Sequence, residues 1–205
     1  MPFTPTTKKG LQTRLTILSA ATDVLARDGY AHARMSDIAA GAGLSVGGLY
    51  RYFENKTELL DALVEDLPAE FSRRSVISSL ELQADPLAAL TQANRGYVEC
   101  YYEHRKVMLI LAEAAAIDAR FRAVSQTLRD RHVARFTRAY RSAIGVDPAL
   151  GVSIESATEA MVCMVEQSCY VWFAQHQGDR TPVSVADAVS VASHAWFATM
   201  FAGML

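Results

Sequence analysis

The chain has 205 residues, of which 51% are hydrophobic and 20% are charged, and its formal net charge at pH 7 is −2. This composition excludes an intrinsically disordered chain, and no apolar run reaches the roughly 18–20 residues that span a bilayer. A charge so close to neutral argues against a protein that coats nucleic acid without selectivity.

The first ten residues are polar and lack the apolar core of a signal peptide, so we expect a cytoplasmic protein. Apolar residues then recur at helical spacing, as at Ile17, Ala20 and Val24. Because no segment alternates with a period of two, we expect an all-α fold of nine helices. Their expected ranges are 8–28, 35–42, 45–53, 55–67, 85–102, 104–116, 118–144, 153–177 and 184–204.

Glycine, proline and capping residues mark the boundaries of these helices. Gly29 and Gly43 are expected to end helices in a conformation with positive φ. Ser45 and Asp85 are expected to cap the helices that follow them. Pro68 is expected to kink or split the fourth helix near residue 66, since proline cannot donate the backbone hydrogen bond there.

The segment 35–53 is predicted to form a helix, a tight glycine turn and a short second helix. This is the geometry of a helix-turn-helix, whose second helix enters the major groove of DNA. The charge is distributed accordingly, because residues 1–56 carry seven Lys and Arg against four Asp and Glu, whereas the remainder carries 13 against 18. A basic front segment on an acidic body confines the attraction for DNA to one end of the chain.

Several short motifs of the N-terminal third match one known family together. They are Gly29-Tyr30, Asp37-Ile38-Ala39-x-x-Ala42-Gly43-x-Ser45, Leu49-Tyr50-x-Tyr52-Phe53 and Asn55-Lys56-x-Glu58-Leu59-Leu60. Residues 11–71 therefore resemble the TetR family of repressors. The resemblance implies a nine-helix architecture, with a helix-turn-helix domain over residues 1–56 and a helical effector-binding and dimerisation domain over 57–205.

The resemblance also implies which residues contact DNA. Tyr50 and Lys56 would hold phosphates, while Val46, Gly47 and Gly48 would approach base edges. The complete expected set is Arg34, Ser36, Ser45, Val46, Gly47, Gly48, Tyr50, Arg51, Tyr52 and Lys56.

The chain departs from the family pattern at two of these positions. Arg34 stands where the family usually has a capping Thr, which removes a hydrogen bond worth about 1 kcal/mol unless Ser36 or a water molecule replaces it. Gly48 stands where the family often has Thr or Ser, and with Gly47 it makes the recognition helix flexible. We therefore expect sequence to be read through Val46 against thymine methyl groups, through Ser36 and through DNA shape.

The last two helices are expected to pair with a second copy of the chain, because one recognition helix reads too few bases. The expected dimer-interface residues are Trp172, Val185, Val189, Ala192, Trp196 and Met200. The alternative is that these apolar residues form ordinary core within one chain.

The helices between the two ends contain aromatic and methionine residues with a few embedded polar groups, a composition typical of a ligand cavity. The expected lining is Asn94, Tyr97, Tyr101, Met108, Glu113, Phe121, Gln126, Met164, Glu166 and Gln167. Glu166 interrupts an apolar run and needs a partner, which could be a ligand, Arg129 or the second subunit. The expected effector is a small apolar or amphipathic molecule.

Together these features predict a homodimeric repressor that a small lipophilic ligand releases from a palindromic operator on double-stranded DNA. A regulator without a small-molecule effector is the first alternative. An enzyme is the second, but the five histidines have no catalytic or metal-binding spacing, so no catalytic residue, metal or cofactor is expected. The three cysteines are expected to be reduced core residues, with a redox sensor as the alternative.

Overall fold

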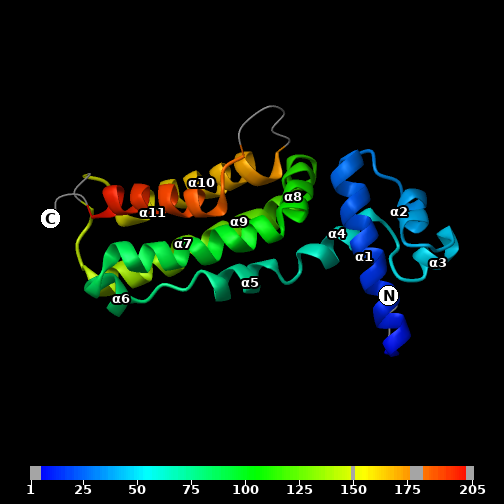
Figure 1. The fold of residues 1–205 in the computed structure, drawn as a ribbon, viewed down its shortest axis with the longest axis horizontal. Coiled ribbons are helices and arrows are strands. Elements are labelled where there is room, and N and C mark those ends of the chain that lie inside the picture. Colours follow the sequence, from blue (N-terminus) through cyan, green and yellow to red (C-terminus); the bar gives the residue numbers. More distant parts are fainter. Residues whose placement is uncertain (1–5, 149–150, 176–181, 202–205) are drawn as a thin grey trace. The chain divides into compact units, whose positions relative to one another are not determined.

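The computed structural model describes residues 6–148, 151–175 and 182–201, and within these ranges the chain forms helices without any strand. This all-α class confirms the prediction from the sequence. The helices, shown in Figure 1, are α1 (Lys8–Asp28), α2 (Met35–Gly41), α3 (Val46–Tyr50), α4 (Lys56–Val64), α5 (Leu67–Arg74), α6 (Ser79–Ala84), α7 (Pro86–Glu103), α8 (Arg105–Ile117), α9 (Ala119–Ala143), α10 (Ile154–Cys169), a π-helical turn (Tyr170–Ala174) and α11 (Val185–Met200).

The helix boundaries differ from the predicted ones in three places. Pro68 lies in the first turn of α5, and the predicted fourth helix is split between Val64 and Leu67. The short helix α6 was missed, because six residues are too few to show an apolar stripe. The eighth predicted helix changes to a π-helical turn after Cys169, and its expected end at residue 177 lies outside the described residues, as does the expected end of the last helix at residue 204.

The chain divides into two compact units. The first combines Met1–Asp66 with Lys106–Val124, and the second combines Leu67–Arg105 with Ser125–Leu205. The expected division was a single cut after Lys56. In the structure α4 and most of α8 belong with α1–α3 instead, because their apolar faces are buried there.

The first unit has a small core formed by every helix in it. Ile17 on α1, Ile38 on α2 and Leu49 on α3 are completely buried. Gly29 ends α1 with a φ of 79°. The carboxylate of Glu113 on α8 accepts a hydrogen bond of 2.8 Å from the backbone N–H of the next residue, Tyr30. These contacts fix the loop that leads from α1 into α2.

The second unit is built from long helices that lie side by side, with α7 packed against α10 and α11 (Figure 1). α9 joins them through aromatic contacts, since the rings of Phe136 and Trp196 have centroids 4.3 Å apart. The hydroxyl of the buried Tyr140 donates a 2.8 Å hydrogen bond to the carbonyl of Met200. The C-terminal part of α9 is thus tied to the end of α11.

α5 and α7 approach each other more closely than side chains would allow. A Cβ atom added to Gly96 on α7 would lie 1.8 Å from the carbonyl oxygen of Arg74, at the end of α5. Only glycine fits this crossing. Phe71 packs one turn away, with its ring centroid 5.0 Å from that of Tyr97.

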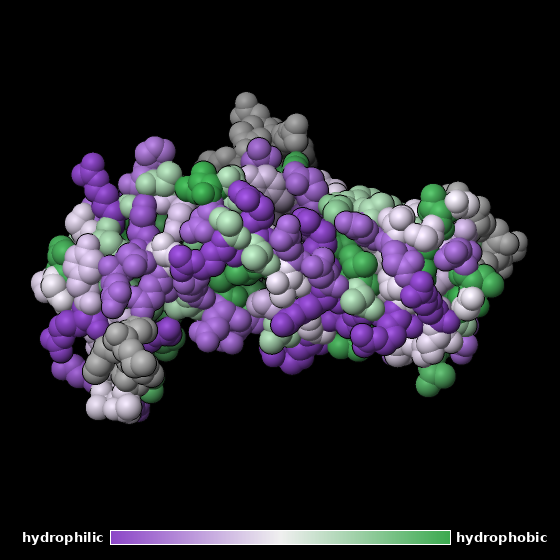
Figure 2. All heavy atoms as spheres, turned by 180° about the vertical axis from the view of Figure 1, so that it is seen from behind, coloured by the Kyte–Doolittle hydropathy of each residue, from purple (hydrophilic) through white to green (hydrophobic). Residues whose placement is uncertain are grey.

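None of the helices in the described ranges is both long enough and apolar enough to cross a membrane. On the face seen in Figure 2, hydrophobic residues form small patches between hydrophilic ones. That pattern is ordinary for a surface exposed to water.

Candidate DNA-binding surface and ligand cavity

The short helix α3 presents one face to the core and the other to solvent. Leu49 is completely buried and Phe53 follows it into the core, whereas 43% of Val46 and 49% of Tyr50 are exposed. Ser45 caps the helix by accepting a 3.1 Å hydrogen bond from the N–H of Gly48. The helix is therefore held from behind while its outer face stays open.

The structure places all the expected DNA-contacting residues on or beside α2 and α3 within the first unit. The exposed ones are Arg34, Ser36, Ser45, Val46, Gly47, Tyr50 and Arg51, and the half-buried ones are Gly48, Tyr52 and Lys56. Their role in contacting DNA stays a prediction.

The start of α2 is uncapped, as the presence of arginine there predicted. Arg34 forms no capping hydrogen bond through its side chain. Ser36 does not replace the missing cap, because its hydroxyl donates to the carboxylate of Asp37 at 3.3 Å. Both side chains are exposed, so Arg34 offers its charge to solvent.

Lys56 has a structural role that the sequence did not reveal. Its ammonium group donates hydrogen bonds to the carbonyl oxygens of Tyr30 at 2.8 Å and Ala31 at 2.9 Å, and it lies 5.4 Å from the centroid of the Tyr30 ring. Partial burial lowers the pKa of Lys56. The expected contact of Lys56 with a DNA phosphate stays a prediction, and two carbonyl oxygens of its own chain also bind the ammonium.

The second unit contains a cavity of about 50 Å³ between α7, α9, α10 and α11. Its volume corresponds to a few water molecules, since one needs about 10–15 Å³ by the same measure. Most of the wall is apolar. The lining residues are Ser75, Ile77, Leu90, Ala93, Asn94, Tyr97, His132, Arg135, Phe136, Val162, Val165 and Trp196.

The polar part of the wall consists mainly of hydrogen-bond donors. Arg135 donates to the carbonyl of Ser72 at 2.9 Å and to the hydroxyl of Ser75 at 2.8 Å. Burial lowers the pKa of Arg135, and no carboxylate of the described chain lies within ion-pair distance of it. Burial also lowers the pKa of His132 to about 4, so this histidine is neutral at pH 7.

Trp196 adds an unused donor to the same wall. The side chain is only 5% exposed, and its indole Nε1 is buried without a hydrogen-bond partner among the described residues. A buried polar group without a partner is costly unless something else binds it.

The wall of this cavity contains two of the ten residues that were expected to line a ligand cavity, Asn94 and Tyr97. Met108, Glu113 and Phe121 lie in the first unit, where they are engaged with its core or with Tyr30. The other expected lining residues are absent from the cavity wall, and they are Tyr101, Gln126, Met164, Glu166 and Gln167.

The positions of these other residues have local causes. Tyr101 is core, while Gln126 and Gln167 are exposed. Glu166 pairs with Arg129 at 2.9 Å, one of the three partners considered for it. A signal for the missed residues was present, because His132, Arg135 and Phe136 lie at i, i+3 and i+4 on one face of α9.

The expected interface residues lie mostly inside the chain. Val189, Ala192, Trp196 and Met200 are at most 5% exposed in the single chain, and Trp172 and Val185 are half-buried. Trp196 therefore does not project outward as an anchor for a second copy. The faces of α10 and α11 that do reach solvent carry other residues, which are Ser156, Glu159, Ala160, Gln167, Ala186, Asp187, Ser190, Val191, His194 and Ala198.

Known proteins resemble the chain at both sequence and fold level. Residues 17–63 match the family described as "Bacterial regulatory proteins, tetR family". The HTH-type transcriptional regulator TtgR of Pseudomonas putida is 30% identical over 132 residues, which cover 64% of this chain and 55% of TtgR. The match thus spans about half the length of this curated relative.

Two solved structures share the fold over nearly the whole chain. NalD, the secondary repressor of the MexAB-OprM multidrug efflux pump in Pseudomonas aeruginosa, has a TM-score of 0.70 at 18% identity, covering 95% of this chain and 98% of NalD. AibR, solved with isovaleryl coenzyme A and operator DNA, has a TM-score of 0.67 at 20% identity, covering 92% of this chain and 100% of AibR. The family match over residues 17–63 thus identifies the N-terminal part of the chain as a TetR-family domain, and the chain shares the all-helical fold of NalD and AibR.

Proposed function

We propose that this protein is a sequence-specific DNA-binding regulator of transcription. The observation that carries the proposal is the outer face of α3, where Val46 and Tyr50 are exposed on a helix held from behind by Leu49. Arg34 and Arg51 lie exposed beside this face and supply charge for phosphates. The TetR-family match over residues 17–63 supports the same role.

The two glycines of α3 favour close contact between this helix and DNA. Apart from its chain neighbours and the backbone of its own helix, no protein atom lies within 4 Å of a Cβ added to Gly47, so the fold does not require glycine at that position. Its absent side chain leaves room for a base edge. Val46, which precedes it, is suited to apolar contact with thymine methyl groups.

We propose that the protein acts as a homodimer on a palindromic operator, with the outward faces of α10 and α11 as the interface. Small residues at helical spacing allow two helices to approach closely, and Ala160, Ser190 and Ala198 are exposed there. Val191, which is 54% exposed, adds an apolar contact. Two recognition helices related by a two-fold axis would read two half-sites.

We further propose that an amphipathic effector with a carboxylate head group binds the cavity of the second unit and releases the operator. Arg135 supplies a half-buried cation without a carboxylate partner in the described chain, and the indole N–H of Trp196 is an unused donor. His132 is neutral at pH 7, so it neither attracts nor repels a carboxylate, and Arg135 is left to bind the head group. The apolar remainder of the wall favours a short hydrocarbon or aromatic tail, and the helices must move apart to admit it, because the cavity of about 50 Å³ holds only a few water molecules. In AibR a ligand and operator DNA are bound by one regulator of this fold.

DNA selection with the purified protein tests the regulatory role. We expect one palindromic sequence to be enriched. The Val46→Ala variant should change the preferred sequence, because Val46 is assigned to base contact, whereas Tyr50→Phe should weaken binding to all sequences equally. Leu80→Ala, at an exposed residue of the second unit, is the control and should leave binding unchanged. If no selected DNA binds more tightly than random sequence does, the proposal is overturned.

Matched pairs of small molecules test the effector class. Butyrate, hexanoate and benzoate should raise the melting temperature and release operator DNA more than 1-butanol, 1-hexanol and benzyl alcohol do. Arg135→Gln should abolish this preference. If the alcohols act as strongly as the acids, the assignment of a carboxylate is wrong. If the acids bind without releasing DNA, the effector role is wrong while the DNA-binding role stands.

A further inference from the structure

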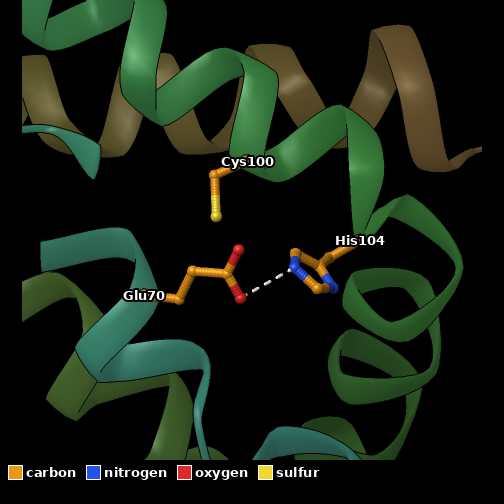
Figure 3. Close-up of side chains that lie close together, drawn as sticks. All are labelled: Glu70, Cys100 and His104. Atoms are coloured by element: carbon orange, nitrogen blue, oxygen red, sulfur yellow. Dashed lines mark hydrogen bonds and ion pairs between the residues drawn. The ribbon is translucent and has the colours of Figure 1, made fainter. Parts of the chain in front are cut away.

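A second group of chemically reactive side chains lies in the second unit, outside the cavity lining. Glu70 on α5 faces Cys100 and His104 at the end of α7, and the three side chains point toward one another in Figure 3. One nitrogen, one sulfur and one oxygen ligand atom from these residues all lie within 4.8 Å of one another. Neither the proposed DNA-binding surface nor the effector cavity uses them.

The backbone determines how the three residues come together. Cys100 and His104 are four residues apart, and the N–H of His104 donates to the carbonyl of Cys100 at 3.1 Å, so both side chains lie on one face of the last turn. Glu70 comes from α5, whose distance from α7 is set by the backbone contact at Gly96. The cluster therefore rests on two helices in tight contact.

His104 Nε2 and Glu70 Oε2 share a hydrogen bond of 3.0 Å, and a metal ion would take the place of the proton between them. Two ligands at about 2.0–2.2 Å from Zn²⁺ in a tetrahedral site are separated by roughly 3.3–3.6 Å, so a small outward shift of the two side chains admits the ion. The Cys100 sulfur completes a set of three ligand types that zinc accepts. Glu70 and His104 are 24% and 31% exposed, so water can reach a fourth coordination position.

The guanidinium of Arg74 opposes a metal ion here, because it lies near Glu70 and Cys100. The guanidinium lies 3.6 Å from Glu70 but is bound more closely by the exposed Glu103, at 2.8 Å for one pair of atoms. Glu99 lies 3.8 Å from the same guanidinium. Two further carboxylates thus compensate the charge of Arg74 and leave Glu70 available to a second cation.

We infer that Glu70, Cys100 and His104 form a binding site for a zinc-like divalent ion that links α5 to α7. The class of ion follows from the ligands, because a thiolate with an imidazole selects Zn²⁺ and similar ions over Mg²⁺ or Ca²⁺. Cys100 becomes a thiolate when the ion displaces its proton. The ion joins two helices of the folded chain and therefore stabilises the native state.

Cobalt(II) is the probe for this site, because cobalt bound to a thiolate absorbs light in a characteristic charge-transfer band. We expect the reduced full-length protein to bind one cobalt ion with this band and to lose the band when zinc is added. Cys100→Ser should lose the band. Cys163→Ser is the matched control, since Cys163 is a half-buried thiol of the same unit away from the cluster, and it should keep the band.

Two further variants keep the inference falsifiable if Cys100→Ser folds poorly. Glu70→Gln preserves the shape of the side chain and should weaken cobalt binding at least about tenfold by losing a charged ligand. Arg74→Gln should tighten binding several-fold, because it removes the opposing cation. Cobalt binding without a charge-transfer band, or a band that survives in Cys100→Ser, would overturn the inference, as would unchanged affinity in Glu70→Gln.

Discussion

Two basic residues beside the recognition helix have different roles although both were expected to contact DNA. Arg34 is exposed and forms no capping bond, so its charge faces solvent. The ammonium of Lys56 is bound to the carbonyl oxygens of Tyr30 and Ala31 and stabilises the loop between α1 and α2. A change at Lys56 therefore alters the fold of the first unit as well as its charge.

This difference predicts separate effects on stability. Lys56→Met should lower the free energy of unfolding by about 1–2 kcal/mol, because two carbonyl groups lose a charged donor and regain only water. Arg34→Gln should leave that free energy within about 0.5 kcal/mol of the wild type. Urea denaturation of both variants measures the difference. Equal stability of the two variants would contradict the structural role of Lys56.

His132 shows how burial decides the charge of one residue. Its pKa is lowered to about 4 by burial, whereas an unfolded chain has a histidine pKa of about 6.5. Between these pH values the unfolded chain binds more protons than the folded one, so stability falls as the pH falls. The stability that the neutral, buried His132 contributes is fully present above pH 6.5 and is lost progressively as the pH falls toward 4.

The pH dependence of unfolding tests this residue. Wild-type protein should lose up to about 1.4 kcal/mol per pH unit between pH 6.5 and 4 from His132 alone. His132→Gln keeps a hydrogen-bonding side chain near Ser75 but cannot take up a proton. Its unfolding free energy should therefore depend less steeply on pH in this window. Urea titrations at pH 7 and pH 5 measure the unfolding free energy of both proteins. If wild type and His132→Gln lose the same free energy between these pH values, His132 does not titrate as described.

At the scale of single helices, glycine serves two opposite purposes. Gly96 allows the backbones of α5 and α7 to touch, since any Cβ there would collide with the carbonyl of Arg74. Apart from its chain neighbours and the backbone of its own helix, Gly47 in α3 has no protein neighbour within 4 Å of an added Cβ. One glycine is required by packing inside the protein, and the other leaves space on its outer surface.

Alanine at these two glycines should therefore act in opposite directions. Gly96→Ala should destabilise the protein by about 3 kcal/mol or more, because one backbone must move away from the other. Gly47→Ala should stabilise the fold by up to about 1 kcal/mol, since alanine favours the helix. Thermal and urea unfolding measure both changes. If the proposed close approach to DNA is right, the more stable Gly47→Ala also binds operator more weakly.

At the scale of the whole molecule, the division into two units separates two proposed tasks. The first unit holds the exposed face of α3, and the second holds the cavity and the outward faces of α10 and α11. Most apolar residues of α11 are already buried by their own chain, which leaves a narrow stripe around Val191 for a partner. A charge within that stripe would face the partner helix directly.

The oligomeric state tests this stripe. Val191→Glu should give monomers by light scattering and should lose affinity for a palindromic operator, because two half-sites are no longer bound together. Leu80→Glu places the same charge on another exposed apolar residue, which is 76% exposed on α6, and should leave the mass unchanged. A dimer that persists in Val191→Glu would exclude this face as the interface.

The sequence by itself determined the features that depend on neighbouring residues. The all-α class, the caps at Ser45 and Asp85, the positive φ of Gly43 and the split at Pro68 were predicted correctly. Each follows from residues within one or two helical turns. The recognition of the family came from motifs of the same local kind.

Tertiary structure alone decided which side chains meet across helices. The cavity wall, the carbonyl partners of Lys56, the contact at Gly96 and the burial of Trp196 all join residues far apart in the chain. Helical periodicity shows that a helix has an apolar face, but not which other helix covers it. For that reason the sequence could not distinguish a face buried within the chain, such as that of α11, from one left open for a second copy.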